Sequence, residues 1–254
     1  MPFVTVHNEK FFYADAGTTG APVVFIHGAG SNHLIWGQQL RAVGAIARAY
    51  AIDLPGHGKS EGAGRDTIDA YRDVVLGFLD AFGLERAVLV GHSMGGAIVQ
   101  AFALAYPARV AGIALVGTGA RLRVLPAILD GVLTDFDTTA RVVTENCFGA
   151  HPDPVLLAKS EEQFRACPAR VTFGDYSACN GFDILARIAE IRAPTLAICG
   201  THDKMTPVKY SEFLVSKIAG ARLAVIQDAG HYVMIEKPIE TNRALVEFLQ
   251  NEIQ

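Results

Sequence analysis

One serine of this chain stands in a pattern that favours nucleophilic chemistry. Gly91-His92-Ser93-Met94-Gly95-Gly96 follows a short apolar run, 86–90, that predicts a buried strand, and precedes residues 97–104, which predict a helix. A sharp turn from strand to helix leaves no room for large side chains at positions 91 and 95, and it lifts Ser93 off the edge of the sheet. The hydroxyl can then act as a nucleophile, provided that a base removes its proton. The competing interpretation is a glycine-rich turn whose serine only caps the helix.

The base should be an imidazole that is neutral near pH 7 and lies at the same edge of the sheet. His231 follows the last predicted strand, in Asp228-Ala229-Gly230-His231-Tyr232, and so satisfies the second condition. His92 adjoins the serine, but neighbouring side chains diverge at a tight turn, which makes it a poor base. His27 and His57 also follow strands, and we assign them roles in holding their loops. His231 is therefore the predicted base.

A carboxylate is needed to orient this imidazole and to stabilise its protonated form. Asp203 follows the strand before the one that leads to His231, which gives the chain order serine, aspartate, histidine. The loop after the predicted strand 110–116, Gly117-Thr118-Gly119-Ala120, is a second place for such an acid but contains no carboxylate. Asp228 is better suited to shaping the turn before His231. Asp203 is therefore the predicted third member.

Attack on a carbonyl also requires N–H groups that stabilise the oxyanion. His27-Gly28-Ala29-Gly30 follows the predicted strand 22–26, and its small residues let the backbone approach a substrate closely. We expect one donor at the amide of Ala29 and the other at the amide of Met94, which directly follows the serine.

The remaining elements predict how these residues are brought together. Continuous apolar strands that alternate with helices favour a parallel sheet covered on both faces, which puts ligands at its carboxyl edge. Residues 1–119 and 191–254 form this predicted core domain, and residues 120–190, which are helix-like without a buried strand, form a helical cap (lid) inserted over that edge. Strands are expected at 3–6, 10–14, 22–26, 49–53, 87–92, 110–116, 195–199 and 223–226, and helices at 34–48, 67–82, 97–104, 207–219 and from 238 onward.

Composition narrows the class of protein. The 254 residues are 50% hydrophobic and carry a net charge of −4, which favours one large α/β domain and gives no reason to expect nucleic acid as a partner. Residues 87–108 lack charged side chains, but glycines and Pro107 interrupt them, so no membrane span is expected. The four cysteines are widely spaced and show no zinc pattern. Reduced thiols and an N-terminus without a signal pattern favour a cytoplasmic protein.

Taken in order, these motifs resemble the α/β-hydrolase superfamily over essentially the whole chain. The resemblance rests on 27–30, 91–96, 200–203 and 230–231, and on a further family fingerprint, Asp53-Leu54-Pro55-Gly56-His57-Gly58-Lys59-Ser60. It implies an eight-stranded, mostly parallel sheet with helices on both faces, an inserted cap, and no metal or organic cofactor. We interpret Asp53 and His57 as residues that hold loops together rather than as catalytic residues.

Within the superfamily, the chain is most similar to small carboxylesterases and monoacylglycerol-type lipases. The serine at position 93 differs from the aspartate nucleophile of the related haloalkane dehalogenases and epoxide hydrolases. Carbon–carbon hydrolases usually have asparagine, a Gly-Gly-Pro-Gly loop and tryptophan where this chain has His92, Ala29-Gly30-Ser31 and Tyr232. Carbon–carbon hydrolase, enol-lactonase and thioesterase remain alternatives on the same three residues, and a non-catalytic ligand-binding protein is the least favoured one.

The expected substrate is a small molecule with an apolar acyl ester. Candidate pocket residues are Trp36 near the oxyanion loop, Leu125 and Leu129 in the cap, and Tyr232 after the base. The sequence leaves the acyl length and the oligomeric state, monomer or homodimer, open. The cap's apolar side chains, most of which should pack the cap onto the sheet, are Leu122, Val124, Leu125, Ile128, Leu129, Leu133, Phe136, Phe148, Phe164, Tyr176 and Phe182.

Overall fold

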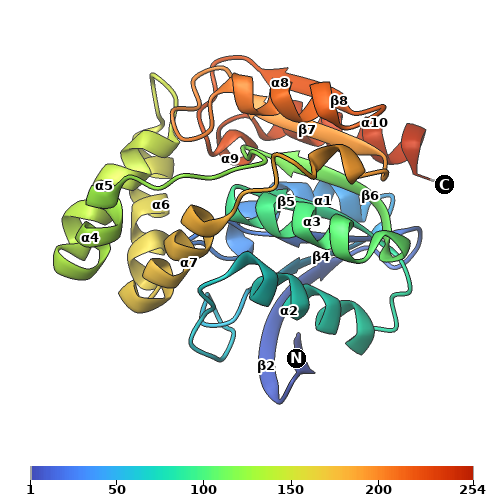
Figure 1. The fold of residues 1–254 in the computed structure, drawn as a ribbon, viewed down its shortest axis with the longest axis horizontal. Helices are drawn as coiled ribbons and strands as arrows, with labels where there is room; N and C mark the ends of the chain where they lie inside the picture. Colours follow the sequence, from blue (N-terminus) through green and yellow to red (C-terminus); the bar gives the residue numbers. More distant parts are fainter. Residues whose placement is uncertain (1, 254) are drawn as a thin grey trace.

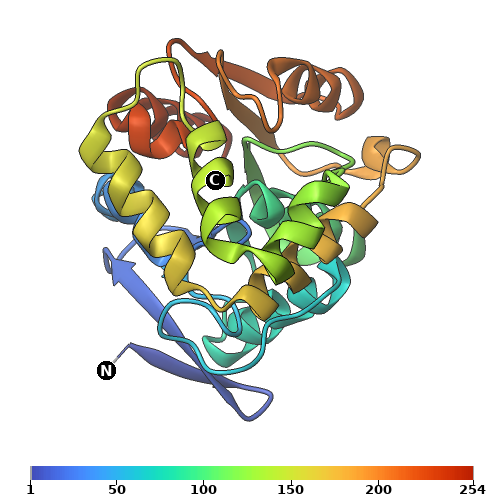
Figure 2. The same cartoon turned by 90° about the vertical axis from the view of Figure 1, so that its left-hand side faces the viewer.

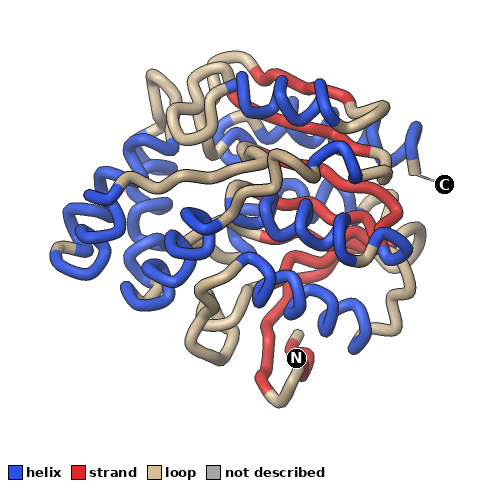
Figure 3. Tube along the Cα trace, in the orientation of Figure 1, coloured by secondary structure: helices blue, strands red, loops and turns tan. Residues whose placement is uncertain are grey.

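The computed structural model describes residues 2–253, which form a mostly parallel sheet of eight strands (Figure 1, Figure 3). The strand order is β1-β2-β4-β3-β5-β6-β7-β8; β2 is antiparallel to both of its neighbours, β1 and β4, and all pairs from β4 to β8 are parallel. The predicted fold class is confirmed. The strands are β1 (Phe3–Val6), β2 (Glu9–Ala16), β3 (Pro22–Ile26), β4 (Arg48–Ile52), β5 (Ala87–His92), β6 (Val110–Val116), β7 (Thr195–Gly200) and β8 (Arg222–Ile226).

Helices cover both faces of this sheet, as the continuous apolar strands predict. On one face α2 (Ile68–Ala81), α3 (Met94–Ala105) and α8 (Val208–Lys217) pack against the strands. On the other face lie α1 (Gly37–Gly44) and α10 (Pro238–Glu252), with the short α9 (Val233–Glu236) beside them. Every residue of β5 and of β7 is buried, because these strands have apolar neighbours on both sides. The three short 3₁₀ helices are η1 (His33–Trp36), η2 (Pro107–Arg109) and η3 (Ile188–Glu190).

The helix predicted over 34–48 is shorter than expected. The segment begins as η1, where the Asn32 side chain accepts a hydrogen bond from the Leu34 amide, and α1 ends at Gly44. A Cβ at Gly44 would lie 2.5 Å from the Ala16 side chain, so this residue passes close to β2. Two turn hydrogen bonds to the Val43 carbonyl then lead directly into β4. The predicted helix therefore extended past the point where the chain meets β2.

Four α-helices connect β6 to β7 and lie together at one end of the sheet (Figure 1, Figure 2). They are α4 (Pro126–Thr134), α5 (Phe136–Cys147), α6 (Pro154–Ala166) and α7 (Ala169–Gly181). The carboxyl ends of the parallel strands meet at this end, because β6 leads from its carboxyl end into these helices and its parallel neighbours run in the same direction. We use the word cap for α4 to α7. Within residues 2–253, none of the helices has the length and apolar character needed to cross a membrane.

The junction between β5 and α3 is a tight turn in the core. A Cβ at Gly91 would lie 2.2 Å from the Gly95 carbonyl oxygen, and one at Gly95 would lie 2.3 Å from the Ile26 carbonyl oxygen. These are backbone atoms, which cannot move aside without distorting the sheet. The two glycines therefore let α3 start immediately after the strand.

We expect Gly91→Ala to destabilise the protein by at least about 2 kcal/mol, because a methyl group there overlaps the backbone. The matched control is Gly37→Ala, since no atom lies within 4 Å of a Cβ at that helical position. That variant should be neutral, or more stable by up to about 1 kcal/mol. Urea unfolding of both variants measures the difference, and equal stabilities would contradict the steric account.

Candidate active site

Ser93 lies on the turn between β5 and α3, in a backbone conformation that side chains rarely adopt. Its φ is 53° and its ψ is −114°, so the residue is strained and its neighbours must hold it in place. Its amide donates a hydrogen bond to the Val116 carbonyl at 2.9 Å, and its carbonyl accepts one from the Thr118 hydroxyl at 2.8 Å. The end of β6 therefore fixes the predicted nucleophile. Its side chain caps nothing, which removes the support for the competing capping interpretation.

His231 and Asp203 form a buried hydrogen-bonded pair, in the order that the sequence predicts. His231 Nδ1 lies 2.9 Å from Asp203 Oδ2. Because a carboxylate only accepts hydrogen bonds, Nδ1 carries the hydrogen, and in the neutral imidazole Nε2 is left as the basic nitrogen. His231 lines the same cavity as Ser93. The arrangement suits a base that takes the serine proton.

Asp203 is held in its ionised form by its partners. The amides of Met205 and Thr206 donate to Oδ1 at 2.9 and 2.8 Å, and the Thr206 hydroxyl donates to Oδ2 at 2.9 Å. Burial alone would raise the pKa of Asp203, but the neighbouring His231 and these hydrogen bonds hold it below its ordinary value. A carboxylate that stays ionised can stabilise a protonated imidazole beside it.

Thr206 has a different role from the one its sequence suggests. Threonine followed by proline predicts the start of a helix at 207, and α8 begins at Val208. The Thr206 hydroxyl does not cap this helix, because it is hydrogen-bonded to Asp203 and lies 3.3 Å from His231 Nδ1. The Thr-Pro pair thus predicts the helix correctly but gives no indication of the contact between Thr206 and the Asp203 carboxylate. Asp228, the rival acid, is exposed in a turn with a φ of 54°.

The loop that carries His231 is held from several sides. His92, which the sequence excludes as the base, donates from Nε2 to the His231 carbonyl at 3.1 Å. Burial, followed by the proximity of His231, lowers the pKa of His92 well below its ordinary value, so His92 is a neutral support. Glu236 accepts hydrogen bonds from the amides of Gly230 and Gly149, which join this loop to the end of α5.

The loop 27–30 lies directly against the serine. A Cβ at Gly28 would lie 2.9 Å from His92 Nδ1 and 3.2 Å from the Ser93 Cβ. Met94 is the first residue of α3, so its amide has no acceptor within the helix. The Ala29 amide has no backbone acceptor among residues 2–253. Both predicted oxyanion donors are thus N–H groups without a backbone partner beside Ser93.

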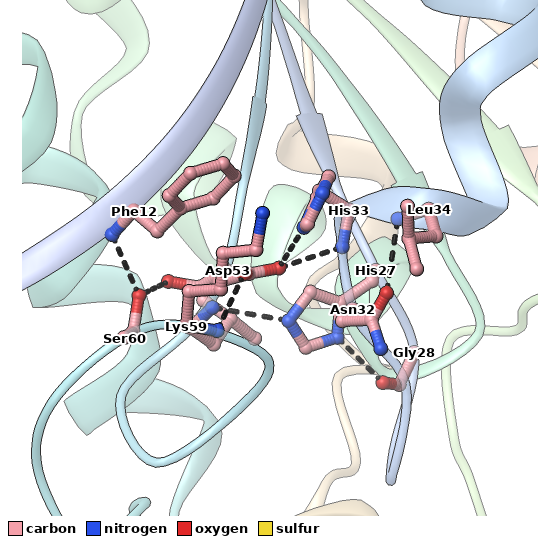
Figure 4. A network of polar contacts seen from close by, with 10 residues as sticks. Phe12, His27, Gly28, Asn32, His33, Leu34, Asp53, Lys59 and Ser60 are labelled. Atoms are coloured by element: carbon pink, nitrogen blue, oxygen red, sulfur yellow. Dashed lines mark hydrogen bonds and ion pairs between the residues drawn. The ribbon is translucent and has the colours of Figure 1, made fainter. Parts of the chain in front are cut away.

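Two buried side chains support this loop (Figure 4). Asp53 accepts hydrogen bonds from the backbone and the ring of His33 at 2.7 and 2.8 Å, and from the Lys59 amide at 2.9 Å. His27 accepts from the Leu54 amide at 3.0 Å and donates from Nδ1 to the Gly28 carbonyl at 2.8 Å. Both residues join the loop after β3 to the loop after β4. Asp53 thus holds loops together, as the fingerprint suggests.

A small cavity of about 30 Å³ lies between these loops and the cap. The predicted pocket residue Tyr232 lines it, together with Ser93 and His231 and with Gly28, Ala29 and Ser31 of the oxyanion loop. The cap contributes Val143 and Cys147 from α5, Phe164 from α6 and Tyr176 from α7. Met205, beside the carboxylate, completes the lining with His92. Helical periodicity could identify these cap positions as buried, but only the packing of three helices decides that they face the serine.

Three other predicted pocket residues lie elsewhere. Leu125 precedes α4 and is 70% exposed, and Leu129 is half-buried within α4; neither lines the cavity, because α4 packs against the cap helices α5 and α7. Trp36 is completely buried, packs against Phe25 and also lies outside the lining. The structure therefore gives no support for the prediction that these three side chains contact the substrate. The four cysteines are free and buried, as expected from their spacing.

Comparison with known proteins identifies the family. The model of the alpha/beta hydrolase fold family matches residues 21–238. The chain belongs to this family. A hydrolase from Burkholderia vietnamiensis is described as acting on 2-hydroxy-6-oxononadienedioate and 2-hydroxy-6-oxononatrienedioate. It is 31% identical over an alignment of 274 residues, gaps included, that covers 95% of this chain and 91% of that protein.

Two solved structures are also similar. The enol-lactonase from Burkholderia xenovorans has a TM-score of 0.93 and 28% identity, over 98% of this chain and all (100%) of that chain. A thermophilic esterase has a TM-score of 0.87 and 36% identity, over 98% of this chain and 96% of that chain. All three proteins are named as hydrolases or by a hydrolase activity, and this chain is a hydrolase as well. Their names refer to the cleavage of different kinds of bond, so membership of the family does not identify the substrate.

The two candidate acids can be separated by matched variants. Asp203→Asn should preserve the fold and lower ester turnover at least about a hundredfold, because the carboxamide misorients the imidazole and cannot stabilise its protonated form. Asp228→Asn should change turnover less than about threefold, since that residue is exposed. Steady-state kinetics on p-nitrophenyl esters compares them. A larger loss in the second variant would contradict the assignment of Asp203.

His27 should make stability depend on pH. Burial, followed by the nearby His57, lowers the pKa of His27 from 6.5 to about 4, whereas an unfolded chain takes up the proton near 6.5. The neutral His27 therefore adds roughly 3 kcal/mol to the free energy of unfolding above pH 6.5, and this contribution is lost as the pH falls towards 4. Urea unfolding across this range should show a shallower dependence in His27→Gln, which does not titrate. Equal dependences would contradict the assignment.

Proposed function

We propose that this chain hydrolyses carboxylic esters through an acyl-enzyme intermediate on Ser93. The observation that carries the proposal is one small cavity lined by both Ser93 and His231, whose Nδ1 is hydrogen-bonded to Asp203. A strained serine, an imidazole with a free Nε2 and a buried carboxylate are the groups that acyl transfer requires.

In this mechanism the Ser93 hydroxyl attacks the ester carbonyl while His231 Nε2 takes its proton. The carbonyl oxygen becomes an oxyanion, which the amides of Ala29 and Met94 stabilise by about 3 kcal/mol or more per donor. His231 then gives the proton to the leaving alkoxide, and the ester C–O bond breaks. A water molecule, activated by the same imidazole, attacks the acyl-enzyme and releases the carboxylic acid, with the proton returned to Ser93.

The lining of the cavity supports a neutral acyl group. Of the described residues that line it, none is a lysine or an arginine, and the cap supplies Val143, Cys147, Phe164 and Tyr176. A carboxylate enclosed there would have no cationic partner, which is costly in a buried site. A short apolar acyl chain would instead gain up to about 0.8 kcal/mol for each buried methylene group.

Carbon–carbon bond hydrolysis is the second candidate, because curated relatives near 30% identity are named for it. The substrates in those names are carboxylates with an enol group, and the uncharged cavity lining favours them less than neutral esters. Lactone cleavage, named for the enol-lactonase relative, uses the same acyl chemistry as ester cleavage. A panel of neutral esters, enol lactones, thioesters and dienone carboxylates therefore distinguishes the candidates.

On p-nitrophenyl acetate and butyrate, we expect turnover that Ser93→Ala reduces to less than about a tenth of the wild-type value. Mass spectrometry should detect an acyl adduct on the wild-type protein and none on the variant. Residual activity above this level would contradict the mechanism. Turnover of the dienone carboxylate alone, without any ester or lactone turnover, would establish the second candidate instead.

Chain-length preference should follow the residues that line the cavity. Val143→Phe narrows the space beside Ser93, so we expect it to move the preferred p-nitrophenyl ester to a shorter acyl chain while acetate turnover changes little. Leu125→Phe is the matched control, because that side chain is exposed and outside the lining. A shift of the profile in the control alone would place acyl recognition outside this cavity.

A further inference from the structure

A carboxylate from the cap reaches into the core beside the oxyanion loop. Asp175 lies in α7, is completely buried, and accepts a hydrogen bond from the Gly30 amide at 2.8 Å. The same oxygen lies 2.8 Å from His57 Nε2, and the other oxygen accepts a hydrogen bond from the Tyr71 hydroxyl. One carboxylate thus joins the cap to the loops after β3 and β4 and to α2.

The partners of His57 indicate that this is a buried ion pair. Nδ1 donates to the Pro55 carbonyl at 2.9 Å, so it carries a hydrogen, and Nε2 points at the Asp175 carboxylate. Burial alone would lower the pKa of His57, but the charge of Asp175 raises it well above its ordinary value. Both side chains are fully shielded from solvent. Removing one partner of such a pair leaves an uncompensated charge.

The hydrogen bond to Gly30 acts on the peptide that follows Ala29. Gly30 has a φ of 63°, and a Cβ there would lie 2.6 Å from the Phe164 ring, so the cap encloses this residue. On the other side of Ala29, the Gly28 carbonyl accepts hydrogen bonds from His27 Nδ1 and from the Ser31 amide. The peptides before and after Ala29 are therefore both held, one by the core and one by the cap.

We propose that Asp175 is a positioning residue that orients the Ala29 amide towards the oxyanion. In this arrangement the cap contributes to stabilising the transition state, in addition to enclosing the acyl group. The proposal rests on the proposed function, because it requires that Ala29 is an oxyanion donor. Displacing a donor by about 1 Å can cost on the order of a hundredfold in rate.

The test compares two variants of the same buried cluster. Asp175→Ala removes the acceptor of the Gly30 amide, whereas Tyr71→Phe removes a different hydrogen bond to the same carboxylate and leaves the Gly30 contact in place. Steady-state kinetics uses whichever neutral ester the wild-type protein turns over best. A trifluoromethyl ketone provides the second readout, because its adduct with Ser93 bears an oxyanion and needs the same donors.

For Asp175→Ala we expect kcat to fall about ten- to hundredfold with KM within about threefold, and the ketone to bind correspondingly more weakly. Tyr71→Phe should keep kcat within about threefold. Asp175→Asn should recover part of the loss, since its carbonyl oxygen can still accept from Gly30. Unchanged kcat in folded Asp175→Ala, a change confined to KM, or equal losses in Tyr71→Phe would overturn the proposal.

If Asp175→Ala does not fold, the double variant His57→Phe with Asp175→Leu replaces the ion pair by apolar side chains, an exchange that proteins often tolerate. It removes the same acceptor and is held to the same criteria. Failure of the proposed function would be recognised separately, because the wild-type protein would then show no ester turnover that depends on Ser93. Failure of the Asp175 proposal would leave wild-type turnover intact and show it unaffected by the loss of the carboxylate.

Discussion

Close approach of backbone segments at the carboxyl edge of the sheet is the constraint on which the rest of this structure depends. Gly95 lies against the end of β3, Gly28 against Ser93, and a Cβ at Gly200 would lie 2.2 Å from the Ala229 carbonyl oxygen. Side chains at these positions would push apart the loops that carry the predicted nucleophile, oxyanion donors, acid and base. Because each loop is in van der Waals contact with the next, the geometry of the site is a property of the packed edge.

Charge is distributed unevenly around this edge. Asp203 is ionised beside His231, and Asp175 is paired with His57, whereas His27 and His92 are held neutral by burial. Each of these buried charges thus has a partner, and among the described residues that line the cavity beside Ser93 there is no aspartate, glutamate, lysine or arginine. The charged groups that fix the backbone of these loops therefore lie outside the cavity lining.

Much of the architecture was predictable because it depends on local patterns. Continuous apolar runs predicted the strands, and Gly-His-Ser-Met-Gly-Gly between a strand and a helix predicted the turn that carries Ser93. The elements that were misjudged depend on distant contacts. The first predicted helix ends early where Gly44 meets β2. The Thr206 hydroxyl donates a hydrogen bond to Asp203 and does not cap α8. Neither contact leaves a signal in the neighbouring residues.

By itself, the sequence determined the fold class, the order of the elements and three chemically suitable residues, because hydrophobic periodicity, glycine turns and the polarity of a parallel sheet are readable along the chain. Only the tertiary structure decided which cap side chains face Ser93, and it left Leu125, Leu129 and Trp36 outside the cavity. It also brought Asp175 beside Gly30, across 145 positions of sequence. Such contacts arise from the packing of whole helices, in which a small rotation of α7 would exchange one side chain for another.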